Sequence, residues 1–485
     1  MLKFYSTNNK TKGVNFESAL LQGLAPDYGL YMIAKNDIPK LQAEQIKNMK
    51  QLSYAEIAFL ILDQFIGDEI PENELKDILN DAYAEEKIPT TLEHITGKTH
   101  IMWLTQGPTY SFKDYAARFF GRTLNYFLGK RGLKRTVIVA TSGDTGGAVA
   151  DALHGLDNVN CLVFYPKDSI SEGQRRQMTT LNDNIYAFAV NGDFDICQAL
   201  AKNLLGNKTL AKEITNDPDN FTSANSISLG RLLPQSVYPF YAYAKTANYP
   251  EPLIASIPSG NFGDMMGTVI AKQMGLPISK IICGVNENAV FPNFLKTGQY
   301  IVKPSKKSPS SAMIVSHPSN LVRLIDFYDG HMYDERDPET KKIIKPGVID
   351  KTPDLNEMRN DLYSISVSNQ DHYQTMKHVY ENFKLILDPH GAVGWQALTT
   401  YLNDSHDQLS IIYETADPGK FPDDIKKAIN IIPEVPAGIK KQAKLEERIF
   451  TIDEPPGFNK LGLKLSDQQI AEAYNKIKQI LSIDK

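Results

Sequence analysis

Cysteine and tryptophan are scarce in this chain, whose 485 residues include three cysteines and two tryptophans. Cys161, Cys197 and Cys283 are well separated, and an odd number of cysteines cannot pair completely within one chain. Two of them lie in apolar, strand-like runs, which favours buried reduced thiols over disulfides or a zinc site. We therefore expect a protein of a reducing compartment, and the cytoplasm fits.

Long apolar runs and a strong excess of one charge are missing as well. The longest apolar stretches, such as residues 57–66, are too short to span a bilayer, and residues 1–20 lack the charged-then-apolar pattern of a signal peptide. The formal net charge of −5 gives no general attraction to nucleic acid or to an anionic membrane. These features predict a soluble cytoplasmic protein with no nucleic-acid partner and no membrane partner.

Common nucleotide and metal motifs are also absent. The chain has no GxxxxGK[ST] segment, and the loop PSGNFG (258–263) lacks the spacing of GxGxxG, which argues against a nucleoside triphosphate or dinucleotide. His154, His317 and His390 lack metal-ligand spacing, and histidines so placed are more often structural. The sequence therefore predicts no metal site.

The order of apolar patterns predicts an α/β protein. With 42% hydrophobic residues, the chain can bury a sizeable core and is long enough for two or three domains. Residues 41–85 have apolar spacing typical of helices. From about residue 100, short β-rich runs alternate with amphipathic helices, which predicts parallel sheets with helices on both faces. Ligands are then expected where strand carboxyl ends meet helix starts.

Three further segments have their own patterns. Residues 297–320 and 328–354 have little periodicity and are rich in polar residues and proline, so they predict surface insertions, with a mobile cover as the alternative for the first. Residues 466–481 predict an amphipathic helix that starts at a Ser466 cap and packs on the main body.

Two motifs in this pattern point to chemistry. GPTYSFKD (107–114) places the Lys113 amine at a turn-to-helix junction, beside small and hydroxylated residues that let a flat ligand approach the backbone. PSGNFGD (258–264) follows an apolar strand, and its glycines free backbone N–H groups to converge on an anion at a helix start. Either motif alone is weak, because surface lysines and glycine loops are common. Together, an amine and a phosphate cradle predict pyridoxal 5'-phosphate.

Six motifs, in this order along the chain, resemble the threonine synthase family, which belongs to the fold type II (tryptophan synthase β-like) group of pyridoxal-phosphate enzymes. They are FYSTN…VNFESALLQGLAPDYGLYM (4–32), GPTYSFKD (107–114), ATSGDTGGAVADAL (140–153), TSANSISLGRLLPQ (222–235), PSGNFGD (258–264) and ETADPGKF (414–421). The resemblance implies the fold type II α/β architecture. It also implies a mainly helical N-terminal domain over residues 1–95 and a catalytic domain over 96–485, with a smaller lobe at 115–235 and a variable insertion at about 297–360.

The resemblance implies a cofactor site around Lys113, which would bond covalently to the cofactor aldehyde and act as the catalytic residue. Because only a neutral amine reacts, we expect burial beside Phe112 and Tyr115 to lower the pKa of Lys113. The other implied cofactor contacts are Gly260, Asn261, Phe262, Gly263, Asp264 and Thr415. Thr415 would hydrogen-bond the pyridine nitrogen. Charge repulsion favours Asp264 opening the helix over contacting the phosphate head-on.

The implied substrate is O-phospho-L-homoserine, which carries a carboxylate and a phosphate. The loop TSGDTG (141–146) follows a strand and starts a helix, so its donors suit the carboxylate, although a purely structural turn explains it equally well without the family. The carboxylate candidates are Ser142, Gly143, Asp144 and Thr145. The phosphate candidates are Ser223, Asn225, Ser226, Arg231 and Lys167.

Two positions depart from the family pattern. Asp417 stands where the family commonly has a histidine two residues after the threonine. An acid aimed at the ring nitrogen would raise the proton affinity of that nitrogen, whereas an acid that faces solvent or caps the next helix would not. Gln106 stands where members often have histidine, and this change puts little in doubt.

The implied reaction is elimination of phosphate from the γ carbon and addition of water at the β carbon, which gives L-threonine in the last step of threonine biosynthesis. The alternatives are a phospho-lyase that releases a 2-oxo acid, another fold type II lyase, or a binding protein without catalysis. The long N-terminal region and SANSISLGR argue against dehydratases and cysteine synthases, and the intact Lys113 argues against a binding protein. A monomer or a homodimer is expected.

Overall fold

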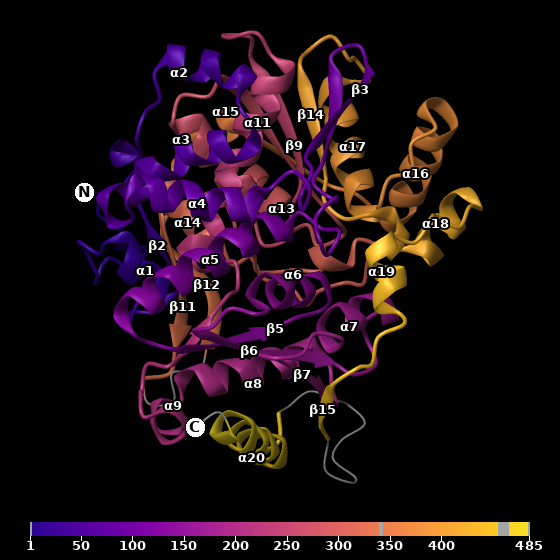
Figure 1. The fold of residues 1–485 in the computed structure, drawn as a ribbon. Helices are drawn as coiled ribbons and strands as arrows, with labels where there is room; N and C mark the ends of the chain where they lie inside the picture. The colour runs from indigo at the N-terminus through magenta and orange to yellow at the C-terminus, as the bar shows by residue number, and fades with distance from the viewer. Residues whose placement is uncertain (1, 339–342, 454–464, 484–485) are drawn as a thin grey trace. The chain divides into compact units, whose positions relative to one another are not determined.

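The computed structural model describes residues 2–338, 343–453 and 465–483, in which helices and strands alternate along most of the chain (Figure 1). These residues fall into two compact units. The large unit is formed by Met1–Ala116 and Ser226–Glu434, and the small unit by Ala117–Asn225 and Val435–Lys485. Within the described ranges, no helix is both long and apolar enough to cross a membrane.

The N-terminal part of the large unit is mainly helical. Its helices are α1 (Phe16–Gln22), α2 (Ala43–Asn48), α3 (Tyr54–Ile66) and α4 (Glu72–Tyr83). A short antiparallel pair, β1 (Tyr5–Ser6) and β2 (Tyr31–Met32), accompanies them. A capping box starts α3, because Ser53 Oγ accepts from Glu56 N at 3.3 Å and the Glu56 carboxylate accepts from Ser53 N at 2.7 Å. The helices predicted over residues 41–85 are confirmed.

A six-stranded sheet forms the centre of the large unit, in the order β13-β10-β9-β14-β4-β3. Its strands are β3 (Thr91–Thr96), β4 (Thr99–Trp103), β9 (Leu253–Pro258), β10 (Ile278–Val285), β13 (Leu362–Ser366) and β14 (Ser410–Glu414). All neighbours are parallel except β3 and β4. Helices α12 (Gly263–Gln273) and α17 (Pro389–Leu402) both pack on β9 and β10.

The remaining elements of the large unit surround this sheet. The helices are α10 (Leu229–Leu232), α11 (Val237–Thr246), α13 (Val290–Thr297), α14 (Leu321–Phe327), α15 (Leu355–Asp361), α16 (Asn369–Phe383) and α18 (Pro422–Ile429). Strands β11 (His331–Arg336) and β12 (Ile343–Lys351) pair as an antiparallel hairpin. The two strands lie within residues 328–354, the segment with little periodicity for which we expected a surface insertion. Most of the hairpin's side chains are at least partly exposed, so the apolar alternation that marks a half-buried strand is missing.

The small unit contains a five-stranded parallel sheet in the order β15-β7-β6-β5-β8. Its strands are β5 (Arg135–Ala140), β6 (Val159–Pro166), β7 (Ile185–Val190), β8 (Phe221–Ser223) and β15 (Ile449–Ile452). Helices α6 (Asp144–Leu153) and α7 (Glu172–Thr179) cover one face, and α8 (Phe194–Gly206) and α20 (Asp467–Ile483) cover the other (Figure 1). Helix α9 (Lys208–Thr215) packs beside α20. The predicted parallel sheets covered on both faces are confirmed.

The predicted C-terminal helix is confirmed as α20. Ser466 Oγ accepts from Gln469 N, and Gln469 Oε1 accepts from Ser466 N, both at 3.1 Å, so Ser466 caps the helix as expected. Ala473 and Ile477 of this helix are fully buried in the core of the small unit. Cys161, Cys197 and Cys283 are buried thiols, and none of the three forms a disulfide.

Candidate active site

Lys113 is the first residue of α5 (Lys113–Arg131), at the end of a tightly bonded turn. The Asp114 carboxylate closes the turn by accepting from Thr109 N at 2.9 Å and from the Thr109 hydroxyl. Gly107 is required there, because a Cβ atom would lie 2.5 Å from Asp114 Oδ2. Lys113 Nζ lies 4.7 Å from the centroid of the Phe112 ring. The turn therefore fixes the position from which the amine projects, with an aromatic ring beside it.

The Lys113 turn is joined to the loop that follows β14. Phe112 N donates to the Thr415 carbonyl at 2.9 Å, and Ser111 forms an isolated antiparallel bridge with Ala416. Thr415 itself is buried, with 6% of its surface exposed. The structure thus brings Lys113 and Thr415 onto adjoining backbone segments.

Asp417 caps the turn that follows Thr415. Its Oδ1 accepts from Gly419 N at 2.7 Å, at the start of the short 3₁₀ helix Pro418–Lys420, which precedes α18. Burial raises the pKa of Asp417. The next cation along the chain, Lys420, is buried and donates to the Thr109 carbonyl at 2.8 Å. Asp417 therefore behaves as a cap, but of this short turn rather than of α18.

The loop 259–262 follows β9, which is the sheet neighbour of β14. It ends at Phe262, which adopts a left-handed φ of 61° and precedes α12 without a side-chain cap. At Gly260 a Cβ atom would lie 2.8 Å from the Ala312 carbonyl oxygen, and at Gly263 it would lie 2.8 Å from Gln235 Nε2. Only glycine allows both approaches. The uncapped N–H groups at the start of α12 suit a phosphate.

Asn261 is held in this loop by residues that the sequence did not single out. Asn320 Nδ2 donates to the Asn261 carbonyl at 3.0 Å, and Ser319 N and Oγ donate to Asn261 Oδ1 at 3.3 Å. Arg323 is fully buried and donates to Asn320 Oδ1 at 2.5 Å and to the Ile227 carbonyl at 2.6 Å. Burial lowers the pKa of Arg323 to about 9. No local pattern could reveal this support, because its members are far apart in sequence.

Asp264 lies in the first turn of α12 and is 5% exposed. Among the described residues, neither of its carboxylate oxygens has a hydrogen-bond partner. Burial raises the pKa of Asp264 well above its usual value, because the buried site disfavours the charged carboxylate. This shift weakens the charge objection to its place in the cofactor loop, because a protonated carboxyl does not repel a phosphate. The uncapped helix start and this orphaned acid fit the phosphate end of pyridoxal 5'-phosphate.

A buried pair, Asp388 and His390, connects the two cofactor loops. His390 Nε2 accepts from Ala312 N at 3.2 Å, so its proton is on Nδ1, which donates to Asp388 Oδ1 at 2.5 Å. Asp388 Oδ2 accepts from Ala416 N at 3.2 Å. The Ala312 segment lies directly against Gly260. Residues 310–313 are therefore packed into the site, which corrects the expectation that 297–320 is a surface insertion throughout.

The carboxylate candidates lie in the small unit, in the loop between β5 and α6. Thr141 Oγ1 accepts from Gly143 N at 3.0 Å and from Gly146 N at 2.9 Å, which folds the loop back on itself. Gly143 has a φ of 143°, in the region that favours glycine. Ser142 is exposed, Thr145 is half-buried and Asp144 is 5% exposed.

The phosphate candidates fall into two groups. In the small unit, Ser223 ends β8, which pairs with β5, and Asn225 N donates to Ser223 Oγ at 3.3 Å. Lys167 follows β6, and its half-exposed ammonium lies 3.9 Å from the Asp453 carboxylate. Residues 142–145 therefore follow β5, whose neighbours in the sheet are β8, which ends at Ser223, and β6, which precedes Lys167.

Ser226 and Arg231 belong to the large unit. Ser226 Oγ lies 3.4 Å from Ser319 Oγ, which is itself bonded to Asn261. Ser226 therefore adjoins the loop after β9 that suits the cofactor phosphate. Arg231, in α10, is 4% exposed, and burial lowers its pKa to about 10. Its backbone carbonyl accepts from Gln235 Nε2 at 2.7 Å, and Gln235 lies against Gly263. In the part of the chain that the structure describes, no group of three His, Cys, Asp or Glu residues is placed to hold a metal ion.

Comparisons with known proteins cover nearly the whole chain. Residues 3–83 match the family Threonine synthase N terminus, 104–346 match Pyridoxal-phosphate dependent enzyme, and 391–457 match Threonine synthase, C-terminal. Threonine synthase of Pseudomonas aeruginosa is 33% identical over 92% of this chain and 95% of its own length. That of Saccharomyces cerevisiae is 34% identical over 92% and 94%. The crystal structure of PLP-bound threonine synthase from Brucella melitensis has a TM-score of 0.85 at 28% identity, with 99% of each chain covered.

Proposed function

The chain belongs to the threonine synthase family, and from that premise we propose that it converts O-phospho-L-homoserine and water to L-threonine and phosphate with pyridoxal 5'-phosphate. One structural observation carries the proposal. The Lys113 turn is bonded to the Thr415 loop, and the uncapped start of α12 follows the neighbouring strand of the same sheet. An amine, a hydroxyl and a phosphate cradle are thus presented along one edge of the sheet, as this cofactor requires.

The cofactor, when bound, draws electrons from the substrate α and β carbons and so makes their protons removable. In our proposal, Lys113 holds the cofactor aldehyde and, once the substrate has taken its place, removes the α proton. Backbone N–H groups of Gly260–Gly263 would bind the cofactor phosphate, with Asp264, whose pKa burial raises, beside them. The Thr415 hydroxyl would form a hydrogen bond with the ring nitrogen. A neutral hydroxyl leaves that nitrogen unprotonated, which favours elimination and replacement over transamination.

We assign the substrate contacts by charge. The loop of Ser142, Gly143, Asp144 and Thr145 opens α6 and is proposed to bind the substrate carboxylate at the positive end of that helix. The substrate phosphate is proposed to meet donors from Ser223, Asn225, Ser226, Arg231 and Lys167. Arg231 supplies the buried guanidinium of this set, and a planar fork of donors suits a phosphate.

Location, assembly and domain limits complete the proposal. We propose a cytoplasmic enzyme that acts on small molecules as a monomer or a homodimer and has no nucleic-acid partner. Three buried thiols without a disulfide among them support a reducing compartment. The proposed domains remain an N-terminal domain at 1–95 and a catalytic domain at 96–485.

The test is a single reaction analysed for three products. Protein loaded with pyridoxal 5'-phosphate is mixed with O-phospho-L-homoserine, and phosphate, threonine and 2-oxobutyrate are quantified together. We expect equal amounts of phosphate and threonine. Phosphate with 2-oxobutyrate would instead identify a phospho-lyase, and no phosphate would overturn both.

Two lysine variants on the same helix separate chemistry from general effects. Lys113→Ala removes the proposed base and is expected to abolish threonine formation. Lys130→Ala changes an exposed lysine near the other end of α5 and is expected to keep full activity. Borohydride reduction followed by peptide mass mapping gives a second readout, since the cofactor mass should appear on the peptide that contains Lys113 and nowhere else.

A further inference from the structure

Helix α7 lies directly against the loop that we propose for the substrate carboxylate. Gln174, in the first turn of α7, is 9% exposed, and its Nε2 donates to Asp144 Oδ1 at 3.1 Å. A Cβ atom at Gly143 would lie 2.5 Å from Gln174 Nε2, so the amide lies flat on the loop backbone. The side chain thus contacts the loop through both a hydrogen bond and close packing.

Two more glycines extend this contact along α6. A Cβ atom at Gly146 would lie 2.5 Å from Met178 Sδ, and one at Gly147 would lie 3.1 Å from Gln177 Oε1. Side chains of α7 therefore rest on bare backbone at the start of α6. Because the glycines have no side chain that could yield at these contacts, a displacement of α7 is passed directly to the backbone there.

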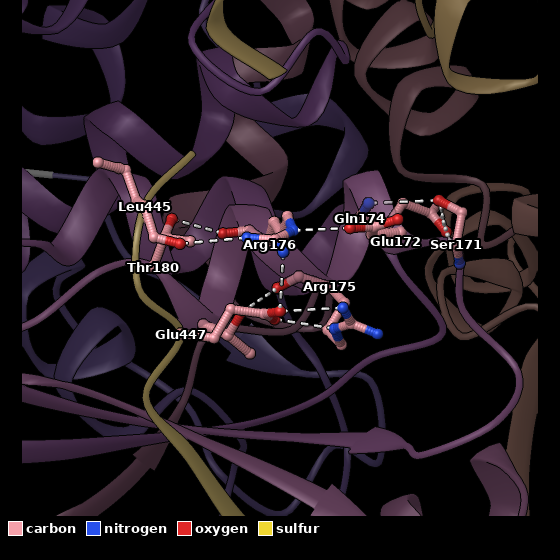
Figure 2. Close-up of polar contacts among 9 residues, drawn as sticks. Ser171, Glu172, Gln174, Arg175, Arg176, Thr180, Leu445 and Glu447 are labelled. Atoms are coloured by element: carbon pink, nitrogen blue, oxygen red, sulfur yellow. Dashed lines mark hydrogen bonds and ion pairs between the residues drawn. The ribbon is translucent and has the colours of Figure 1, made fainter. Parts of the chain in front are cut away.

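The outer side of α7 is fixed by residues from the C-terminal end of the chain (Figure 2). Glu447, whose side chain is 16% exposed, accepts from Arg175 Nε at 2.8 Å and Arg175 NH2 at 2.9 Å, in a two-pronged ion pair. It also accepts from Thr179 Oγ1 at 2.7 Å and lies 3.4 Å from Arg176 NH2. The hydrogen bond and charge of Arg175 lower the pKa of Glu447, so the carboxylate stays ionised near neutral pH.

Backbone groups of the same segment add to this attachment. Arg176 NH1 donates to the Leu445 carbonyl at 3.1 Å, and Arg448 N donates to the Thr179 carbonyl at 2.7 Å. Segment 445–448 therefore contacts α7 through two backbone groups as well as the Glu447 carboxylate. About 270 residues of sequence separate α7 from segment 445–448, as the pair of Arg175 and Glu447 illustrates.

We propose that Gln174 is a positioning residue for the substrate-carboxylate loop and that Glu447 holds α7 against that loop from the C-terminal segment. The proposal rests on the proposed function, because it takes residues 142–145 as the carboxylate site. Gln174 fixes the Asp144 side chain and so holds the backbone of residues 142–145 in position for the ligand. The loss of either contact loosens the loop and weakens substrate binding, while Lys113 and its cofactor loops, in the large unit, remain intact.

Two Gln174 variants test the positioning contact. Gln174→Ala removes the donor, and Gln174→Glu keeps the shape but places a second carboxylate against Asp144. We expect KM for O-phospho-L-homoserine to rise about tenfold in Gln174→Ala, the loss of about one hydrogen bond, and further in Gln174→Glu. The kcat should stay within about twofold. An unchanged KM in both variants would overturn the proposal, whether or not kcat falls.

Glu447→Gln tests the clamp, with Glu213→Gln as its matched control. Glu213 forms a surface ion pair with Lys478 of α20, on the other face of the sheet from α7. We expect Glu447→Gln to raise KM about threefold and Glu213→Gln to leave it unchanged. Circular dichroism and the absorbance of bound cofactor verify that each variant folds.

Hydrogen exchange supplies a readout that does not depend on activity. Peptides covering 141–147 and 172–179 should exchange faster in Glu447→Gln and in the Gln174 variants, and at the wild-type rate in Glu213→Gln. Wild-type exchange in all variants would overturn the proposal even if the enzyme proved to have another activity. Faster exchange together with an unchanged KM would also overturn it, because the loop would then not be positioned for the substrate. A wild-type protein that releases no phosphate fails the proposed function instead.

Discussion

Three aspartates in the loops of the candidate site have the same side chain and different surroundings. Asp114 accepts two hydrogen bonds from Thr109 and closes the Lys113 turn. Asp264 accepts none from the described residues, and burial raises its pKa well above the usual value. Asp417 accepts from a backbone N–H and caps a turn. Local surroundings therefore decide whether each carboxyl closes a turn, remains without a hydrogen bond in a buried site, or caps a turn.

The surroundings of Asp417 lead to a prediction about its departure from the family pattern. Asp417→Asn keeps the acceptor for Gly419 N and should leave stability nearly unchanged, whereas Asp417→Ala removes it and should cost about 1 kcal/mol of unfolding free energy. Urea unfolding of the cofactor-free protein measures both. The pH titration of the bound cofactor's absorbance should match wild type in Asp417→Asn. A shifted titration would mean that the carboxyl faces the ring nitrogen.

Sequence spacing predicted the residues that follow strands and missed the residues that hold them in place. Lys113 and the 258–264 loop were predicted as site residues because their glycines and hydroxyls are contiguous in sequence. Gln174 and Arg323 could not be predicted in this way. Gln174 bonds to Asp144, 30 positions away, and Arg323 bonds to Tyr31, 292 positions away. Contacts of that kind depend on tertiary packing, which no local pattern records.

At the scale of elements, α12 is placed by close backbone contact. A Cβ atom at Gly267 would lie 2.6 Å from the carbonyl carbon of Gln235, in the 3₁₀ helix Leu233–Ser236. Gln235 also lies against Gly263, at the first turn of the same helix. Gly263 and Gly267 of α12 therefore both pack against Gln235, and this contact fixes the helix that presents the phosphate cradle.

A single methyl group at Gly267 should disturb this contact. Gly267→Ala must push α12 away from the backbone of Gln235, so we expect a loss of 1–3 kcal/mol in unfolding free energy and weaker binding of pyridoxal 5'-phosphate. The matched control is Gly206→Ala in α8, where a Cβ atom would meet nothing within 4 Å. That change should be neutral or stabilising by up to about 1 kcal/mol. Cofactor titration measures the affinity for pyridoxal 5'-phosphate, and urea unfolding measures the stability of both variants. Equal affinity and stability in the two variants would show that α12 can shift freely.

Elements with strong apolar periodicity were predicted, and elements without it were not. Strands β9 and β14 are fully buried and read as continuous apolar runs, so their places were recognised. The β11–β12 hairpin has many exposed side chains, and β15 is a short edge strand, so neither shows the alternation of a half-buried strand. The proposed domain limits at 95 and 96 stay a prediction.

At the scale of the whole molecule, folding removes several carboxyl groups from water. Burial raises the pKa of Asp264 and of Glu414 well above their usual values, the latter also through the neighbouring Asp388. Burial likewise raises the pKa of Asp326, in α14, to about 6. Each of these groups binds its proton more tightly in the folded chain than in the unfolded chain. Together they make stability fall as pH rises through the range in which the unfolded carboxyls have ionised and the folded ones have not.

Asp326 allows this contribution to be isolated. Between about pH 4 and 6 the folded chain keeps the Asp326 proton and the unfolded chain releases it, so the unfolding free energy falls by up to about 3 kcal/mol through that window and stays lower above it. Asp326→Asn has no proton to release and still accepts from the Tyr5 hydroxyl, which contacts Asp326 in the native protein. Its stability relative to wild type should therefore grow by up to about 3 kcal/mol from pH 4 to pH 7 in urea unfolding. Asp404→Asn, at an exposed position, should follow the wild-type curve throughout. Parallel curves for Asp326→Asn and wild type would show that Asp326 is already ionised in the folded chain at these pH values.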